Sequence, residues 1–190
     1  VVTRCGASLF LLWLIAYFDL SLPSSLSPWL QGYLAVIPFW LMLEMVEAFL
    51  QLLWLPTGFL VPPINNRPYL SASVTEFWGR RWNRLFGDWL YRVCFKPCSL
   101  RPRRALGVTF LISALLHEFL VSLPYYLVYE KSLFGWMVGY FLLQYLAILF
   151  ERSVLSRRTW MCRVFGMIAV LGPAPLVLNP GTLAIFQMVR

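Results

Sequence analysis

Hydrophobic positions in this chain fall into long runs, which short polar and basic stretches separate. The hydrocarbon core of a bilayer is about 30 Å thick, so a helix of about 20 apolar residues crosses it. By that measure we expect membrane-spanning helices over Leu9–Leu20, Trp29–Leu55, Ala105–Tyr129, Leu133–Phe150 and Met161–Leu178. The first run is short for a span, and Gly181–Val189 is a candidate for the start of a further one. The pattern predicts an all-α, multi-pass integral membrane protein, built as a transmembrane helix bundle.

The loops between these runs differ in charge. If Arg4 is cytoplasmic, residues 19–28 lie on the opposite side and hold no Lys or Arg, whereas the next loop, 67–104, holds nine. The turn after the third span has only Lys131, and four arginines follow the fourth span. Fourteen of the sixteen basic residues then share one side, as expected because cytoplasmic loops carry the excess of Lys and Arg. Charge and hydropathy thus support the same spans.

One part of the long basic loop has a helical period. Residues 56–70 are rich in Pro and Asn and are expected to be extended, but 73–95 alternate between an apolar and a basic face. The apolar face holds Trp78, Trp82, Leu85, Phe86, Trp89 and Val93. This pattern predicts one amphipathic helix that lies in the membrane plane. Ser73 or Thr75 is expected to cap it, with Glu76 in its first turn.

The composition excludes a soluble globular domain. Hydrophobic residues make up 60% of the chain and charged residues 13%, with a mean hydropathy of +0.70, whereas soluble domains carry about 25% charged residues. Membrane topology explains the net charge of +8, so we expect no nucleic-acid partner. The chain starts at Val1 and ends inside an apolar run, so we expect residues 1–190 to be one membrane domain and a fragment of a longer protein. With one His, the four Cys cannot form a zinc site at the usual spacings, and we interpret them as free thiols.

His117 is the only histidine, and it lies in the middle of a predicted span. Ser113 and Thr109 precede it by one and two helical turns and share its face, whereas Glu118 points about 100° away. Ionisable side chains inside a membrane are expensive and face protein or a water-filled cavity. His117 is therefore either a hydrogen-bonding group between helices or a general base, since an imidazole suits proton transfer at neutral pH.

Other charged groups leave more than one interpretation open. Glu44 and Glu47 lie one helical turn apart in the second predicted span. We favour a structural role, in which they pair with Arg or backbone groups. The alternative is a proton or ion pathway, which would indicate a transporter. The arginines of 80–104 fix topology, bind anionic lipid heads or receive a phosphorylated substrate. Glu151 begins a loop and is expected to have no special role.

Two motifs resemble a known family. Residues 76–83 read EFWGRRWN, followed by Arg92 and Lys96-Pro97, and residues 113–122 read SALLHEFLVS. In this order the two motifs resemble the signature of the membrane-bound O-acyltransferases (MBOAT). The sequence of the first motif is closest to that of plant-type wax synthases. The second also looks like the diacylglycerol and sterol acyltransferases. The resemblance covers about residues 68–180.

The resemblance implies an acyl-CoA-dependent O-acyltransferase that transfers a fatty acyl group to a long-chain alcohol and forms a wax ester. Diacylglycerol or sterol acceptors, a transporter and a scaffold without chemistry are the alternatives. The implied catalytic residues are His117 as base and Asn83 as oxyanion donor or orienting group; the expected substrate-binding residues are Trp78, Arg80, Arg81, Trp82, Arg84 and Ser113. We expect no metal and no cofactor besides acyl-CoA as co-substrate, membrane lipids as partners, and in a eukaryote the endoplasmic reticulum membrane. Relatives usually have more spans, which agrees with a fragment.

Overall fold

The chain is represented by a computed structural model that describes residues 6, 10, 22, 23, 25–59, 62–98, 101–155, 159–186 and 188. Regular structure in these ranges is helical, which confirms the predicted all-α class. The predicted span Leu9–Leu20 falls, apart from Phe10, outside the described residues. Four helical segments of the described chain are long and apolar enough to cross a membrane: Val36–Thr57, Pro102–Tyr129, Trp136–Leu155 and Trp160–Val177. They match the four longer predicted runs.

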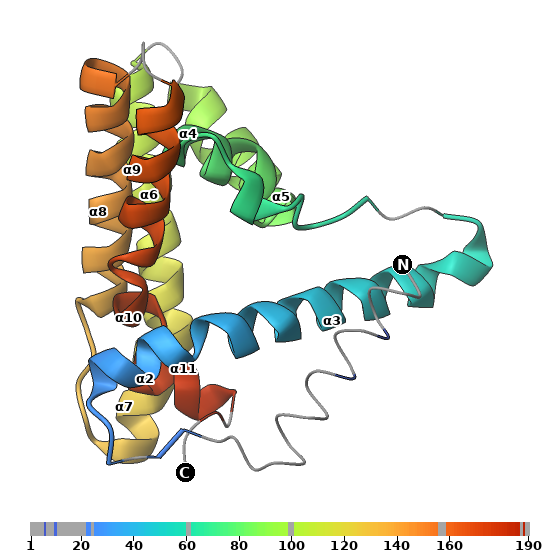
Figure 1. Cartoon of the computed structure of the whole chain (residues 1–190), viewed down its shortest axis with the longest axis vertical. Helices are drawn as coiled ribbons and strands as arrows, with labels where there is room; N and C mark the ends of the chain where they lie inside the picture. Colours follow the sequence, from blue (N-terminus) through green and yellow to red (C-terminus); the bar gives the residue numbers. More distant parts are fainter. Residues whose placement is uncertain are drawn as a thin grey trace.

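Three of these segments form a bundle (Figure 1). The first consists of α6 (Pro102–His117), a π-helical turn and α7 (Leu123–Tyr129); the second is α8 (Trp136–Phe150), extended by a π-helical turn over Glu151–Leu155; the third is α9 (Thr159–Leu171) with α10 (Ala174–Val177). The candidate run 181–189 begins with a short helix, α11 (Pro180–Ile185). Because α6 and α8 are antiparallel, the start of α6 and the end of α8 lie at one end of the bundle.

The predicted span Trp29–Leu55 is two helices, α2 (Pro28–Leu34) and α3 (Val36–Trp54), which meet at Ala35. The break follows from Pro38, which has no N–H to donate to the Leu34 carbonyl and whose ring crowds that oxygen. Figure 1 shows α3 running across the direction of the bundle helices, with its far end away from them. The chain then returns to the bundle through residues 62–72.

The amphipathic segment 73–95 is not one helix, so that prediction is wrong. It forms α4 (Val74–Glu76) with a π-helical turn over Phe77–Arg81, then α5 (Arg84–Leu90) with a second π-helical turn over Tyr91–Phe95 and a 3-10 turn over Lys96–Cys98. The break lies at Asn83, whose φ of 38° and ψ of 59° are left-handed. Asn tolerates this conformation better than most residues because its short amide can hydrogen-bond locally. The predicted cap is confirmed for Ser73, whose Oγ accepts from the Glu76 N–H at 2.9 Å.

The core of the bundle lies between α6, α8 and the start of α4. It consists of Val74, Phe110, Ala114, Tyr140, Phe141, Ala147 and Ile148. Gly166 on α9 permits the close approach of α4, because a Cβ at this position would lie 3.2 Å from the backbone of Ser73 and Val74. Cys162 on the same helix is a buried free thiol, as predicted. The segment that carries the first motif is therefore docked into the bundle through the start of α4.

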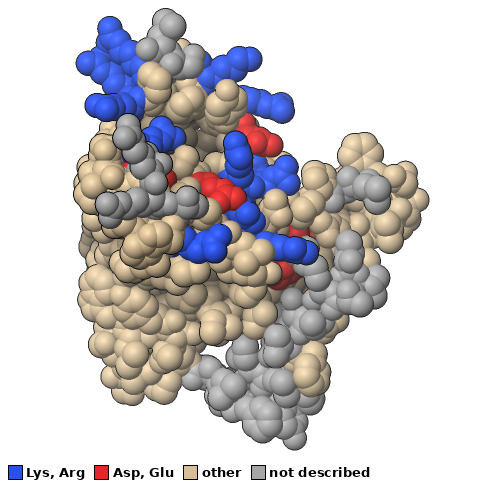
Figure 2. All heavy atoms as spheres, turned by 45° about the horizontal axis from the view of Figure 1, so that its top comes forward, with Lys and Arg blue, Asp and Glu red and all other residues tan. Residues whose placement is uncertain are grey.

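Basic side chains gather at the end of the bundle where α6 begins and α8 ends, which Figure 2 brings to the front. Among the described residues these include Arg101, Arg103, Arg104 and Arg152, whereas Lys131 lies in the turn between α7 and α8 at the other end. The predicted segregation of charge along the bundle is thus present in the fold. The two ends of the bundle therefore differ in charge.

Candidate active site

His117 is held by its own helix. Its Nδ1 lies 2.7 Å from the Ser113 carbonyl oxygen one turn earlier. A carbonyl can only accept, so Nδ1 carries the proton and, in the neutral ring, Nε2 keeps a lone pair. The ring also packs on Phe141 of α8, with 4.7 Å between the ring centroids. The imidazole of His117 is therefore held in one orientation, with its lone pair on Nε2.

A cavity of about 1070 Å³ reaches His117. Its walls are mainly apolar. They come from α3, from α4 and α5 of the segment 73–95, from α6 and α8, and from the segment α9 to α11. Of the predicted site residues, those that line it are Trp78, Trp82, Asn83, Arg84, Ser113 and His117. Within the described chain, Arg80 and Arg81 do not line it. The fold thus brings the two motifs to one space that is large enough for a long acyl chain.

Trp78 forms part of the wall and also ties the motif to the bundle. Its indole N–H donates to Gln144 Oε1 at 3.2 Å, and its ring packs against Phe110 and Phe141. Gln144 is fully buried on α8, and its amide N–H donates to the Ala169 carbonyl at 2.8 Å. Both hydrogen-bonding ends of this buried amide are therefore satisfied, as burial requires.

Asn83 is held by contacts from distant parts of the chain. Its backbone N–H donates to Asn65 Oδ1 at 3.0 Å, and the Asn65 N–H donates to Glu47 Oε2 on α3 at 2.7 Å. Asn65 and Glu47 are both buried. The Asn83 Oδ1 accepts from the Phe86 N–H at 3.3 Å and caps α5. Asn83 lines the cavity, and its side-chain NH₂ makes no hydrogen bond within the part of the chain that the structure describes. The predicted pairing of Glu47 with backbone is confirmed.

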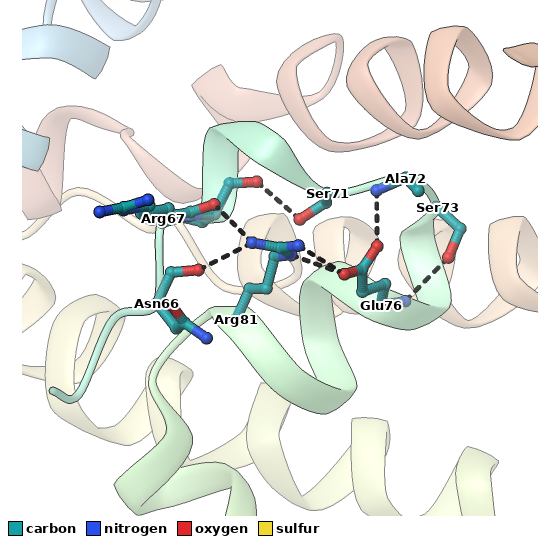
Figure 3. A network of polar contacts seen from close by, with 8 residues as sticks. Asn66, Arg67, Ser71, Ala72, Ser73, Glu76 and Arg81 are labelled. Carbon is teal, nitrogen blue, oxygen red and sulfur yellow. Dashed lines mark hydrogen bonds and ion pairs between the residues drawn. The ribbon is translucent and has the colours of Figure 1, made fainter. Parts of the chain in front are cut away.

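Arg81 belongs to a network of polar contacts (Figure 3), and among the described residues it does not line the cavity. It pairs with Glu76 at 2.7 Å and donates to the carbonyls of Asn66 and Arg67 at 3.3 and 3.4 Å. A hydrogen bond from the Ala72 N–H lowers the pKa of Glu76; partial burial opposes this shift and the Arg81 pair supports it. In this structure the guanidinium of Arg81 stabilises the loop that carries Asn65.

Two buried carboxylates, Glu151 and Glu118, connect the two ends of α8 to other helices. Neither role was predicted from the sequence. Glu151 accepts from the Val74 and Thr75 N–H groups at 2.6 and 3.2 Å and from the Thr75 hydroxyl at 2.7 Å. The expectation that Glu151 has no special role is wrong, because it satisfies the positive N-terminus of α4. Glu118 points away from His117, as predicted, and accepts from three backbone N–H groups at the start of α8. An acidic residue alone in the sequence does not reveal which distant helix it caps.

These features describe an all-α membrane protein with a mainly apolar cavity that both motifs line and that reaches His117. The sequence profile described as "Membrane bound O-acyl transferase family" matches residues 61–143. Over 148 residues the chain is 30% identical to the probable long-chain-alcohol O-fatty-acyltransferase 8 of Arabidopsis thaliana. The alignment covers 72% of this chain and 43% of that protein. No solved structure matches.

Two shorter matches have the same character. The long-chain-alcohol O-fatty-acyltransferase of Simmondsia chinensis and the acyl-CoA–sterol O-acyltransferase 1 of Arabidopsis thaliana are each 36% identical over 66 residues, 30% of this chain and 19% of each protein. The chain spans less than half the length of the relatives it matches. The segment with both motifs belongs to the membrane-bound O-acyltransferase family.

Proposed function

We propose that the protein is an O-acyltransferase that transfers a fatty acyl group from acyl-CoA to a long-chain alcohol and yields a wax ester. The observation that carries the proposal is that His117 and Asn83 line one mainly apolar cavity, while the Ser113 carbonyl holds the imidazole proton on Nδ1 and leaves the lone pair on Nε2. The names of several relatives, long-chain-alcohol O-fatty-acyltransferases, support the acceptor class. We place the basic end of the bundle toward the cytoplasm, where acyl-CoA is dissolved, and in a eukaryote we place the protein in the endoplasmic reticulum membrane.

His117 Nε2 removes the proton of the alcohol as the alcohol oxygen attacks the thioester carbon and the new C–O bond forms. Negative charge develops on the thioester oxygen, and this oxygen accepts a hydrogen bond from the Asn83 NH₂ group. The C–S bond then breaks, and the CoA thiolate takes the proton back from the imidazolium. The Ser113 carbonyl holds the other imidazole proton on Nδ1 throughout. The scheme needs no metal and no acyl-enzyme.

The apolar walls of the cavity suit this chemistry for two reasons. They solvate the hydrocarbon chains of both substrates, and they keep out water that would hydrolyse the thioester. A sterol is the second candidate acceptor, because one relative is an acyl-CoA–sterol O-acyltransferase. Diacylglycerol is chemically equivalent as a hydroxyl donor, and the shape of the cavity, not the base, distinguishes these acceptors.

The test uses membranes from cells that express the whole protein containing this chain. With labelled acyl-CoA we expect an ester with a long-chain alcohol, and we expect His117→Ala to lower its formation by about 10²–10⁴-fold because the base is lost. Lys131→Gln, at the other end of the bundle, is the matched control and should retain activity. Diacylglycerol and a sterol, offered in parallel, define the acceptor. Full activity of His117→Ala would refute the base, and proton movement without ester would indicate a transporter.

A further inference from the structure

The apolar face that the sequence predicts for the segment 73–95 is divided in the structure. Three of its members line the large cavity: Trp78, Trp82 and Phe86. The other three are exposed: Leu85 at 70%, Trp89 at 47% and Val93 at 53%. We propose that these exposed residues, the α5 stripe, contact the hydrocarbon of the bilayer and thereby hold Asn83 in place at the cavity. The contact with lipid is independent of the proposed reaction, whereas its effect on the rate rests on that reaction.

The members of the α5 stripe recur every four residues along α5 and the π-helical turn that continues it, so they lie on one side of the segment. The opposite side faces the large cavity through Gly87, Leu90 and Tyr91. α5 is therefore a wall that has the cavity on one side and the exposed stripe on the other. Apolar residues that recur on one exposed face of an amphipathic helix are typical of a membrane-contacting surface.

The position of α5 in the fold favours lipid as the partner of the α5 stripe. α4, which precedes it, is bound through its backbone to Glu151, one turn before the end of the span Trp136–Leu155. The 20 residues of that span match the thickness of the hydrocarbon core, so α4 begins near the boundary of this core. Figure 1 shows α5 outside the three bundle helices and inclined to them. The stripe thus continues the exposed apolar surface of the spans.

The polar and aromatic groups of this segment suit the same boundary. Arg92 and Lys96 are exposed in the turns that follow α5. Their long side chains can reach lipid phosphates while the apolar residues beside them enter the hydrocarbon. The indole of Trp89 combines an apolar ring with a polar N–H, and such rings are enriched at membrane interfaces. Charge and apolar surface therefore match a helix that is partly immersed in a bilayer.

The α5 stripe is coupled to Asn83 because α5 begins at this residue. The Asn83 Oδ1 caps the helix by accepting from the Phe86 N–H at 3.3 Å. A helix of seven residues has little stability of its own, so its side-chain contacts decide whether it keeps its place. Lipid contact along the stripe stabilises the helix, and the hydrogen bond from the Asn83 N–H to Asn65 holds its start. Without the apolar stripe, α5 can shift and displace the Asn83 side chain from the cavity.

The first experiment identifies what covers the α5 stripe. The photoreactive amino acid p-benzoylphenylalanine replaces Leu85 in the whole protein containing this chain, and the protein is irradiated in nanodiscs of phosphatidylcholine and phosphatidylserine. We expect phospholipid adducts by mass spectrometry, as at the reference position Ile168, which is 64% exposed on α9. A crosslink from position 85 to another segment of the protein or to a second copy, in place of lipid, overturns the proposal.

The second experiment measures the effect of the contact on Asn83. For Leu85→Gln we expect kcat to fall about tenfold, a part of the factor of about 10²–10³ that one oxyanion donor contributes. The KM for acyl-CoA should stay unchanged, and Leu85→Met, which remains apolar, should retain the wild-type kcat. Ile168→Gln is the matched control, since Ile168 is not among the described residues that line the large cavity. An unchanged kcat for Leu85→Gln, or an equal loss for Ile168→Gln, overturns the coupling.

Two comparisons keep the inference separate from misfolding and from the proposed reaction. In the Asn83→Ala background, Leu85→Gln should have almost no further effect on kcat, whereas general misfolding would lower kcat equally in both backgrounds and overturn the coupling. If the wild type forms lipid adducts at position 85 but no ester, the transferase function fails while the membrane contact stands. If it forms ester but position 85 reacts only with protein, the inference fails while the transferase function stands.

Discussion

His117 and Asn83 line the same cavity, but the chain positions them in opposite ways. His117 is the last residue of α6, and its imidazole is oriented by a carbonyl of the same helix, four residues earlier. Asn83 lies at a break between two helices, and its left-handed backbone is held by Asn65, which in turn is held by Glu47 on α3. One side chain is positioned by local geometry, and the other by a chain of tertiary contacts.

The two residues therefore differ in their sensitivity to changes elsewhere in the fold. A change far from the cavity, in α3 or in the loop 62–72, can displace Asn83 without disturbing His117. The network of Figure 3 strengthens the same loop, because Arg81 donates to the carbonyls of Asn66 and Arg67. The Asn66 N–H returns a hydrogen bond to the Arg81 carbonyl at 2.7 Å. The following variants separate the two modes of positioning.

After the removal of His117, the largest expected effect is that of Asn83→Ala. Loss of one donor to a developing oxyanion lowers kcat by about 10²–10³-fold. The KM for acyl-CoA should change little, because the oxyanion forms only in the transition state. Steady-state kinetics in membranes measure both constants, normalised to the amount of protein. A wild-type kcat would remove Asn83 from the mechanism.

A smaller effect is expected for Asn65→Ala, which removes the acceptor for the Asn83 N–H. We expect kcat to fall about tenfold, equivalent to about 1.4 kcal/mol, with an unchanged pH dependence, because His117 is held within α6. Asn66→Ala is the matched control, because Asn66 contributes its backbone N–H and carbonyl to the network and its side chain is exposed.

A double-mutant cycle decides between positioning and general destabilisation. If Asn65 acts through Asn83, Asn65→Ala has almost no further effect on kcat in the Asn83→Ala background. Equal losses in both backgrounds would show that Asn65 only stabilises the fold.

The smallest effect is expected for Glu76→Gln in the network of Figure 3. The pKa of Glu76 is below its ordinary value of 4.5, so its ionised form stabilises the fold above that pH, and the stabilisation is lost as the pH falls through the lowered value. A partly exposed pair contributes about 0.2–1 kcal/mol. Thermal unfolding in detergent should show a lower Tm for the variant at pH 7, and a smaller difference at acidic pH. A difference that grows on acidification would contradict this assignment.

Much of the fold follows from features that act over short distances. The four longer apolar runs became the helices that are long enough to span a membrane, and His117, Ser113 and Thr109 share a helix face that reaches the cavity. Within 73–95, however, the helical period predicted one continuous helix. It missed the break at Asn83 because hydrogen bonds from residues 64–66, remote in sequence, stabilise a left-handed residue that the periodicity does not record.

By itself, the sequence determined that this is a multi-pass membrane protein and that its single histidine lies in a helix long and apolar enough to span a membrane, because hydropathy and helical spacing are properties of neighbouring residues. It also carried the two motifs of the family. Only the tertiary structure decided which carboxylate caps which helix, how Asn83 is held, and which side chains line the cavity that both motifs reach. Those outcomes depend on contacts between residues far apart in the chain, and such contacts exist only once the helices have packed.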